Sequence, residues 1–349
     1  MLIASILFAA KDDPQAPALL APALLAPALL VPAHRVPVPR TVSPELQQVI
    51  AAPSDPSWSI VPKSSDEFKA LVRSDADATK ATLPQLRETL GVTVAQMTVG
   101  GVNAYMVTPT VLPERNRNRL VVHVHGGAYL FGPGEAGTLE AIELAGYGQF
   151  KVLSIDYRMP PDHPFPAALD DAIAVWKVAV TMAKPENMAI FGSSAGGGLT
   201  LALVLRAKQD RLPLPAAIAP GTPWADLSKT GDSYFSNEML DNILVSYDGL
   251  LESCALLYAN GQDLKHPFIS PLYGDLHGFP PTILTTGTRD LFLSNTVRVH
   301  RKLRQCGVEA ALHLYEGMSH AHFCINPYAP ESKEAFREIS TFFDAHLGR

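Results

Sequence analysis

The sequence has few cysteines, no cluster of basic residues and no apolar run long enough to span a bilayer. Its three cysteines, Cys254, Cys306 and Cys324, lie far apart and form no CxxC pair, which argues against a disulfide framework and a cysteine zinc site. The net charge is −6, without a long basic run. Nucleic acid is therefore not an expected partner, because phosphate binding needs clustered lysine and arginine.

The first 44 residues differ in composition from the rest of the chain. A five-residue Ala-Pro-Ala-Leu-Leu repeat runs from Ala16 to Leu30 and places a proline at every fifth position. Each proline inside a helix costs about 3 kcal/mol, so this segment is not a membrane-spanning helix. No basic residue precedes Leu2, as a signal peptide would require. We interpret residues 1–44 as an unstructured leader and expect a cytoplasmic protein. Export through an atypical leader is the alternative.

The remaining residues alternate strand and helix patterns. Residues 45–91 carry apolar side chains at helical spacing, with prolines separating short helices. A strand pair is expected at Val92–Val99 and Val102–Thr108, with Gly100 and Gly101 at the turn. Continuous apolar strands follow at residues 119–125, 151–156, 188–191, 216–219, 282–286 and 311–315. Apolar strands separated by helices predict a mostly parallel central sheet flanked by helices, an α/β fold.

The strand–helix alternation lapses between Trp224 and Gln262. We predict that this stretch, together with residues 45–91, forms a helical cap over the sheet. The expected organisation is therefore a leader (residues 1–44), N-terminal cap helices (residues 45–91) and a catalytic domain (residues 92–349) with a cap insertion at about residues 224–262.

The segment Gly192-Ser193-Ser194-Ala195-Gly196 fits the pattern G-x-S-x-G. It joins a predicted strand to a predicted helix, which is the context of a nucleophile elbow, a sharp turn that exposes a reactive serine. The free N–H groups at the helix N-terminus can stabilise a developing oxyanion. A phosphate-binding loop is the alternative, but it needs a lysine shortly after the glycines, and none follows until Lys208.

Three further groups complete a hydrolytic site. His125-Gly126-Gly127-Ala128 ends a predicted strand, where lipases and esterases place an oxyanion loop. Asp290 and His320 follow the predicted strands 282–286 and 311–315, and the carboxyl ends of such strands form the ligand-binding edge. The order Ser, Asp, His is typical of α/β-hydrolases. We predict Ser194 as nucleophile, His320 as general base and Asp290 as the carboxylate that orients it.

With these residues the chain resembles the hormone-sensitive-lipase family of α/β-hydrolases, the bacterial family IV esterases, over about residues 92–345. The matching segments are His125-Gly126-Gly127-Ala128, Asp156-Tyr157-Arg158, His163 to Ala168, Asp170-Asp171, Gly192 to Gly197, Asp290 and Glu316-Gly317-Met318-Ser319-His320. The resemblance implies a capped sheet and hydrolysis of short-chain esters through an acyl-enzyme, without metal or cofactor. It also implies Gly126, Gly127 and Ala195 as the oxyanion donors.

The chain departs from the family pattern at three places. Ala128 replaces a third glycine, Ser193 stands where the family has Asp or Thr, and Asp290-Leu291-Phe292 lacks the usual proline and acidic residues. For the substrate pocket we expect the following wall residues: His125, Tyr129, Ser193, Trp224 and His322.

Several alternatives remain open at this point. A lactonase or an amidase would use the same triad. A metallohydrolase is suggested by two H-x-H pairs, His123/His125 and His320/His322, since residues i and i+2 share a strand face. A catalytically silent binding module on this fold is the third alternative. The expected partner is a small-molecule ester, with no nucleic acid and no membrane span; a homodimer is compatible with the sequence.

Overall fold

A computed structural model describes residues 31–348. Most of the predicted leader, residues 1–30, lies outside this range. Residues 31–43 contain no helix or strand. The first helix, α1 (Pro44–Ile50), begins where the Ser43 hydroxyl accepts a hydrogen bond from the N–H of Leu46. The chain divides into two units, Met1–Pro37 and Val38–Arg349, and all helices and strands of residues 31–348 lie in the second.

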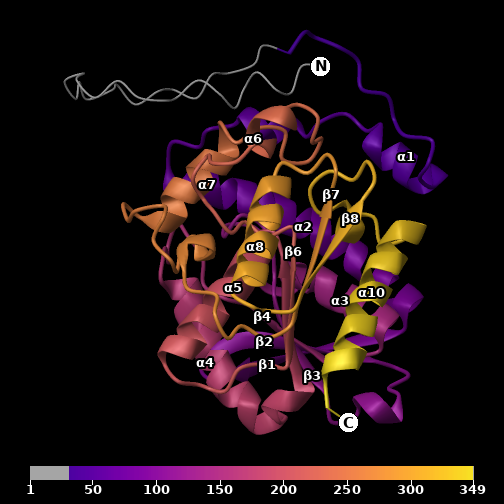
Figure 1. Cartoon of the computed structure of the whole chain (residues 1–349), viewed down its shortest axis with the longest axis vertical. Coiled ribbons are helices and arrows are strands. Elements are labelled where there is room, and N and C mark those ends of the chain that lie inside the picture. The colour runs from indigo at the N-terminus through magenta and orange to yellow at the C-terminus, as the bar shows by residue number, and fades with distance from the viewer. Residues whose placement is uncertain (1–30, 349) are drawn as a thin grey trace, which may run out of the picture. The chain divides into compact units, whose positions relative to one another are not determined.

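An eight-stranded sheet forms the centre of this unit (Figure 1). Its order is β1-β2-β4-β3-β5-β6-β7-β8, with antiparallel pairing of β1 with β2 and of β2 with β4, and parallel pairing elsewhere. The strands are β1 (Val92–Val99), β2 (Val102–Pro109), β3 (Leu120–Val124), β4 (Val152–Ile155), β5 (Met188–Ser193), β6 (Ala217–Gly221), β7 (Thr282–Gly287) and β8 (Ala310–Tyr315). The predicted fold class is confirmed.

The central strands are apolar throughout because both faces of the sheet are covered. Val122 and Val124 of β3 pack into one hydrophobic cluster, whereas Val121, which points to the opposite face of the sheet, packs into the other. The cluster of Val122 contains side chains from α4 (Ala167–Met182), α5 (Ala195–Gln209) and α8 (Leu293–Gln305). The cluster of Val121 contains side chains from α3 (Leu139–Gly148) and α10 (Pro330–His346). Alternate side chains of one strand therefore serve two cores.

Helix α2 (Ser65–Leu90) differs from the expectation of short helices separated by prolines. It is one continuous helix of 26 residues with Pro84 inside it. Proline removes one backbone hydrogen bond, but Leu83 and Leu86 on either side are buried, and their packing offsets that loss. Gly91, in the left-handed conformation at φ 62°, ends the helix.

The stretch 224–262, predicted as a cap insertion, contains two short helices, α6 (Ser233–Ser236) and α7 (Leu250–Ala259), joined by irregular segments. The remaining elements are short: α9 (His322–Ile325) and the 3-10 turns η1 (Pro56–Ser59), η2 (Glu114–Asn116), η3 (Gly134–Thr138), η4 (Pro185–Asn187) and η5 (Pro271–Tyr273). Among the helices of residues 31–348, none combines the length and the apolar character needed to cross a membrane.

Candidate active site

Ser194 lies on the sharp turn between β5 and α5. Its backbone has φ 59° and ψ −124°, a conformation that costs a non-glycine residue free energy and that clusters at functional sites. The turn is held in place because the carbonyl oxygen of Ser194 accepts hydrogen bonds from Gly198 at 3.0 Å and Trp224 at 2.8 Å. The strand–turn–helix context predicted for the G-x-S-x-G segment is therefore present.

Gly192 and Gly196 flank the turn because β3 lies directly against it. A Cβ atom at either position would collide with the carbonyl oxygen of Val124. Any larger residue would thus push α5 away from the sheet, and Ser194 would move with it.

His320 and Asp290 are brought together by the loops that follow β8 and β7. The Nδ1 atom of His320 lies 3.0 Å from Oδ1 of Asp290, and both side chains are buried. The Nε2 atom of His320 is also buried and has no hydrogen-bond partner within residues 31–348. With Nδ1–H donating to the carboxylate, the lone pair of Nε2 is free to accept a proton.

The Asp290 carboxylate is stabilised in its charged form. Its oxygens accept hydrogen bonds from Thr286 Oγ1 at 2.7 Å, from the N–H of Phe292 at 2.7 Å and from the Thr222 hydroxyl. Burial alone would raise the pKa of Asp290, but His320, Thr222 and the Phe292 N–H together lower it. Asp290 is therefore ionised at neutral pH and holds the imidazole in one orientation.

Gly126 and Gly127 line the same cavity as Ser194, and Ala195 directly follows Ser194 in the chain. Within the described part of the chain, the N–H groups of Gly126, Gly127 and Ala195 donate no hydrogen bond to another backbone or side-chain group. Gly127 has φ 105°, a conformation that glycine adopts without strain. Unpaired donors at a helix N-terminus and a glycine loop are suited to bind an oxygen that becomes negative.

A cavity of about 350 Å³ opens onto Ser194 and His320. One wall comes from the N-terminal segment, through Trp58, Asp75 and Thr79. A second wall comes from the insertion at 224–262, through the apolar side chains of Ile243, Leu244, Leu250 and Leu251 and the thiol of Cys254. Both segments predicted to form a cap therefore contribute to the same cavity.

Of the five residues expected to line the pocket, His125 and Ser193 do so. The Nδ1 atom of His125 lies 2.8 Å from the carbonyl oxygen of Gly126, and its ring stacks on Tyr157 at 4.1 Å. Burial lowers the pKa of His125 to about 4, so the ring is neutral at neutral pH. These contacts of the ring, with the Gly126 carbonyl oxygen and with Tyr157, hold it against the Gly126-Gly127 loop.

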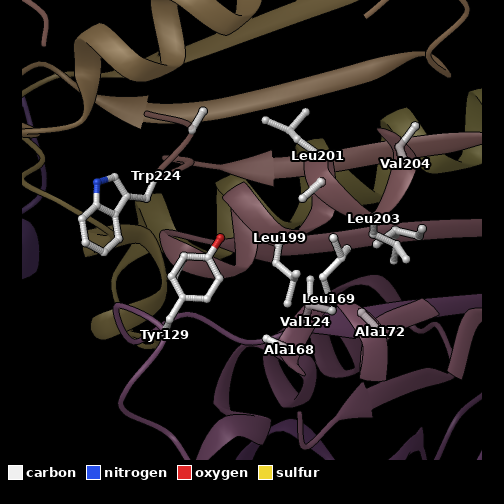
Figure 2. Packing of buried hydrophobic residues seen from close by; sticks show 14 of the residues in the cluster. Val124, Tyr129, Ala168, Leu169, Ala172, Leu199, Leu201, Leu203, Val204 and Trp224 are labelled. Atoms are coloured by element: carbon white, nitrogen blue, oxygen red, sulfur yellow. The ribbon is translucent and has the colours of Figure 1, made fainter. Parts of the chain in front are cut away.

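Tyr129, Trp224 and His322 differ from that expectation, because none of them lines the cavity. Tyr129 and Trp224 belong to the hydrophobic core cluster, and Figure 2 shows Tyr129 between Trp224 and Leu199. Tyr129 stacks on Tyr258, with ring centroids 3.8 Å apart. The large aromatic surfaces are worth more in the core than at a wall, where part of each ring would meet water.

His322 is buried, and its Nδ1 atom accepts a hydrogen bond from the N–H of Ser319 at 3.1 Å. Burial lowers the pKa of His322 to about 4, so the ring is neutral. The ring fixes the loop that carries His320.

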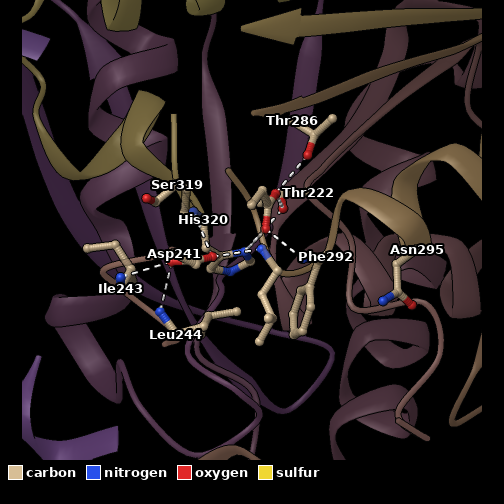
Figure 3. A network of polar contacts seen from close by, with 12 residues as sticks. Thr222, Asp241, Ile243, Leu244, Thr286, Phe292, Asn295, Ser319 and His320 are labelled. Carbon is tan, nitrogen blue, oxygen red and sulfur yellow. Dashed lines mark hydrogen bonds and ion pairs between the residues drawn. The ribbon is translucent and has the colours of Figure 1, made fainter. Parts of the chain in front are cut away.

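Three polar residues near His320 and Asp290 were not predicted from the sequence. Asp241 is a second buried carboxylate in the polar network around His320 (Figure 3), and the hydroxyls of Thr222 and Thr286 contact Asp290. Thr286 stands four residues before Asp290, at the end of a strand, and that proximity is a usable signal. Asp241 and Thr222 carry no local motif, and only the fold brings them here.

The H-x-H pairs do not form metal-binding groups in the described residues. The only group of three potential ligands within mutual reach there is Asp275, His277 and Cys306, which lies outside the cavity lined by Ser194. The first pair has other contacts: Nδ1 of His123 lies 2.9 Å from the Ser154 hydroxyl, and His125 contacts Gly126.

The proteins that this chain resembles in sequence and in structure include several named as esterases. A family model described as "alpha/beta hydrolase fold" matches residues 121–324. An esterase of Acinetobacter venetianus is 31% identical over 66% of this chain and 76% of its own length, and an acetyl-hydrolase of Streptomyces hygroscopicus is 30% identical over 68% and 79%.

Two crystal structures extend this comparison. The structure of an esterase, E25, has a TM-score of 0.89 and 44% identity, covering 92% of this chain and 99% of its own. An esterase from the bacterial hormone-sensitive lipase family has a TM-score of 0.72 and 27% identity, covering 88% and 99%. Together with the α/β sheet and the elbow at Ser194, these matches show that the chain belongs to the hormone-sensitive-lipase family of α/β-hydrolases.

Proposed function

We propose that this carboxylesterase hydrolyses esters of short acyl chains through an acyl-enzyme on Ser194. The observation that carries the proposal is the pairing of two features at one cavity. Ser194 stands on the strained turn, and the buried His320–Asp290 pair opens onto the same cavity with Nε2 of His320 unpaired within residues 31–348. A nucleophile, a base and an orienting carboxylate are the minimum set for acyl transfer without a metal.

In the first half-reaction, the Ser194 hydroxyl attacks the carbonyl carbon of the ester while Nε2 of His320 takes the hydroxyl proton. The carbonyl oxygen becomes an oxyanion and accepts hydrogen bonds from the N–H groups of Gly126, Gly127 and Ala195. His320 then returns its proton to the leaving alcohol, the bond between carbon and alcohol oxygen breaks, and the acyl group stays on Ser194.

In the second half-reaction, His320 takes a proton from water, and the resulting hydroxide attacks the acyl carbon. A second oxyanion forms, and the same backbone N–H groups stabilise it. The bond to Ser194 breaks, the serine oxygen regains a proton from His320, and the carboxylic acid leaves. The charge on Asp290 favours the imidazolium in both halves, because the Asp290 carboxylate touches Nδ1 of His320.

The acyl-chain preference tests the substrate class. Each methylene that fits an apolar wall contributes about 0.8 kcal/mol of binding, or roughly fourfold in kcat/KM. The cavity of about 350 Å³ lies near the lower end of ligand pockets. We expect kcat/KM for p-nitrophenyl esters to be highest with short acyl chains and to fall for sixteen carbons. Equal or better turnover of the sixteen-carbon ester would contradict the proposal.

Two leucines of α7 supply a matched control for this profile. Leu250 lines the cavity, whereas Leu256 of the same helix is exposed. Leu250→Ala should shift the preferred chain towards longer esters, and Leu256→Ala should leave the profile unchanged.

Metal removal is expected to leave the activity unchanged. The proposed reaction needs no Lewis acid, since the oxyanion is stabilised by backbone N–H groups. After dialysis against EDTA, the initial rate of butyrate ester hydrolysis should stay within about 10% of the untreated rate, because preorganised backbone donors stabilise the oxyanion without a metal. The margin allows for assay scatter. A loss that zinc or manganese restores would favour the metallohydrolase alternative.

A further inference from the structure

Asp241 is a fully buried carboxylate in the 224–262 insertion, and the reaction proposed above does not use it. Its Oδ1 atom accepts hydrogen bonds from the N–H groups of Ile243 at 2.9 Å and Leu244 at 3.1 Å, in its own segment. Its Oδ2 atom accepts from the N–H of Leu291 at 2.8 Å and from the N–H of His320 at 3.2 Å. One carboxylate therefore joins the insertion, the loop of the acid and the loop of the base (Figure 3).

The same segment holds both catalytic loops at further points. The side-chain amide of Asn237 donates to the carbonyl oxygen of Asp290 at 2.8 Å and to that of Thr288 at 3.2 Å. The N–H of Asn242 donates to the Ser319 hydroxyl at 3.3 Å. Residues 237–244 therefore fasten the acid loop and the base loop to the cap, with Asp241 in contact with both.

The protonation state of Asp241 depends on the charged groups around it. Asp290 and His320 act directly on it, and His322 and Arg289 belong to the same charged surroundings. Burial is the larger cause and the negative charge of Asp290 the smaller cause that together raise the pKa of Asp241 to about 6. Protonation of His320 favours the ionised carboxylate, so Asp241 carries its charge when the imidazolium forms.

We propose that Asp241 is a positioning residue for the triad, which holds the backbones of residues 290–291 and 320 in register and adds a second negative charge beside the imidazolium. This role rests on the proposed triad. The His320 ring must accept a proton on one nitrogen while donating from the other, and both angles follow from the backbone position of its loop. A carboxylate that accepts from both loops fixes that position, and its charge stabilises the same imidazolium that Asp290 contacts.

The variant Asp241→Asn tests this role, with Asp248→Asn as the matched control. Asn has the same shape, but it removes the charge and turns one acceptor into a donor that faces N–H groups. Asp248 lies in the same insertion, and its exposed carboxylate pairs with Lys229 at 2.8 Å. The readouts are kcat and KM for a butyrate ester, the kcat/KM–pH profile and the melting temperature.

For Asp241→Asn we expect kcat to fall about 10- to 100-fold with KM within about threefold. The midpoint of the acid limb of the profile should move to lower pH by about 0.5–1 unit, since one negative charge no longer favours the imidazolium. Asp248→Asn should match the wild type in both readouts.

Three outcomes overturn the proposal. A folded Asp241→Asn protein with wild-type kcat does so directly. A fall in kcat with an unmoved acid limb assigns Asp241 to structure alone. Should Asp241→Asn not fold, Asp241→Ser leaves room for water beside the same N–H groups and is measured in its place; if it also fails to fold, the residue serves folding and not positioning. Wild-type-like activity in a Ser194→Ala protein would instead reject the proposed function itself, so the two failures are distinguishable.

Discussion

Ser194→Ala is expected to abolish ester hydrolysis, with kcat falling about 10⁴- to 10⁶-fold while the protein stays folded. The substitution removes the attacking oxygen but keeps a Cβ at the turn, so the strained backbone at φ 59° is no worse for alanine than for serine. The measurement is kcat/KM for a butyrate ester, together with far-UV circular dichroism and the melting temperature. More than about 1% of wild-type activity in a folded variant, far above the residual expected when a triad member is removed, would reject Ser194 as the nucleophile.

Covalent labelling provides the control for this variant. An organophosphate should modify the wild-type protein once, on the peptide that contains Ser194, and should leave Ser194→Ala unmodified. Ser193 is adjacent and also lines the cavity, so fragment-ion mass spectrometry must separate the two serines. A label on Ser193 would mean that Ser193, and not Ser194, is the nucleophile.

His320→Ala should be almost as inactive as Ser194→Ala, whereas His322→Ala should lose less than about tenfold, since members of a triad act as a unit and neighbours do not. Nε2 of His320 is unpaired within the described chain, and its Nδ1 contacts Asp290. Nε2 of His322 is unpaired there too, but Nδ1 of His322 accepts from the Ser319 N–H, so in the neutral ring the proton sits on Nε2 and that atom cannot act as a base. Single-turnover acylation, measured as the burst of p-nitrophenol, separates this step from product release.

The free energy of unfolding provides a second measurement on the histidine variants. His322 is buried and satisfies a backbone N–H, so its truncation should lower the free energy of unfolding by about 1–3 kcal/mol. If His322→Ala acylates more slowly than His320→Ala, then His322 is the base and the interpretation of this loop is wrong.

The strands could be predicted from the sequence because burial on both faces leaves a strong local signal. All eight lie within two residues of the predicted ranges. The helices were harder to predict. Pro84 indicated a break in the N-terminal segment, yet α2 continues through it because Leu83 and Leu86 are buried. In α3 both Glu140 and Glu143 are buried among apolar residues, so no polar face marks it as a helix.

The candidate site could be predicted to the extent that its residues follow strands. Ser194, Asp290 and His320 each lie just after a predicted strand, and the carboxyl ends of neighbouring parallel strands meet at one edge. Asp241 lies in an irregular segment about 50 residues from its partner Leu291 in the loop of Asp290. A contact between residues so far apart in the sequence cannot be predicted from a local hydrophobic pattern. Tyr129 and Trp224 were misplaced for a related reason, because aromatic side chains near a motif can face either the cavity or the core.

The way the cavity is assembled bears on how this protein could diversify. Ser194, Asp290 and His320 follow the ends of strands, whereas Trp58 and Leu250, which line the same cavity as Ser194, belong to two other segments of the chain. Mutation can therefore reshape those walls and change the accepted ester while the chemistry is inherited intact. Residues 241–244 are different, because Ile243 and Leu244 line the cavity while Asp241 contacts the loops that carry Asp290 and His320. If the proposed triad holds, a substitution that changes the accepted ester at these positions would also disturb the loops of Asp290 and His320, so fewer changes are acceptable there than at Trp58 or Leu250.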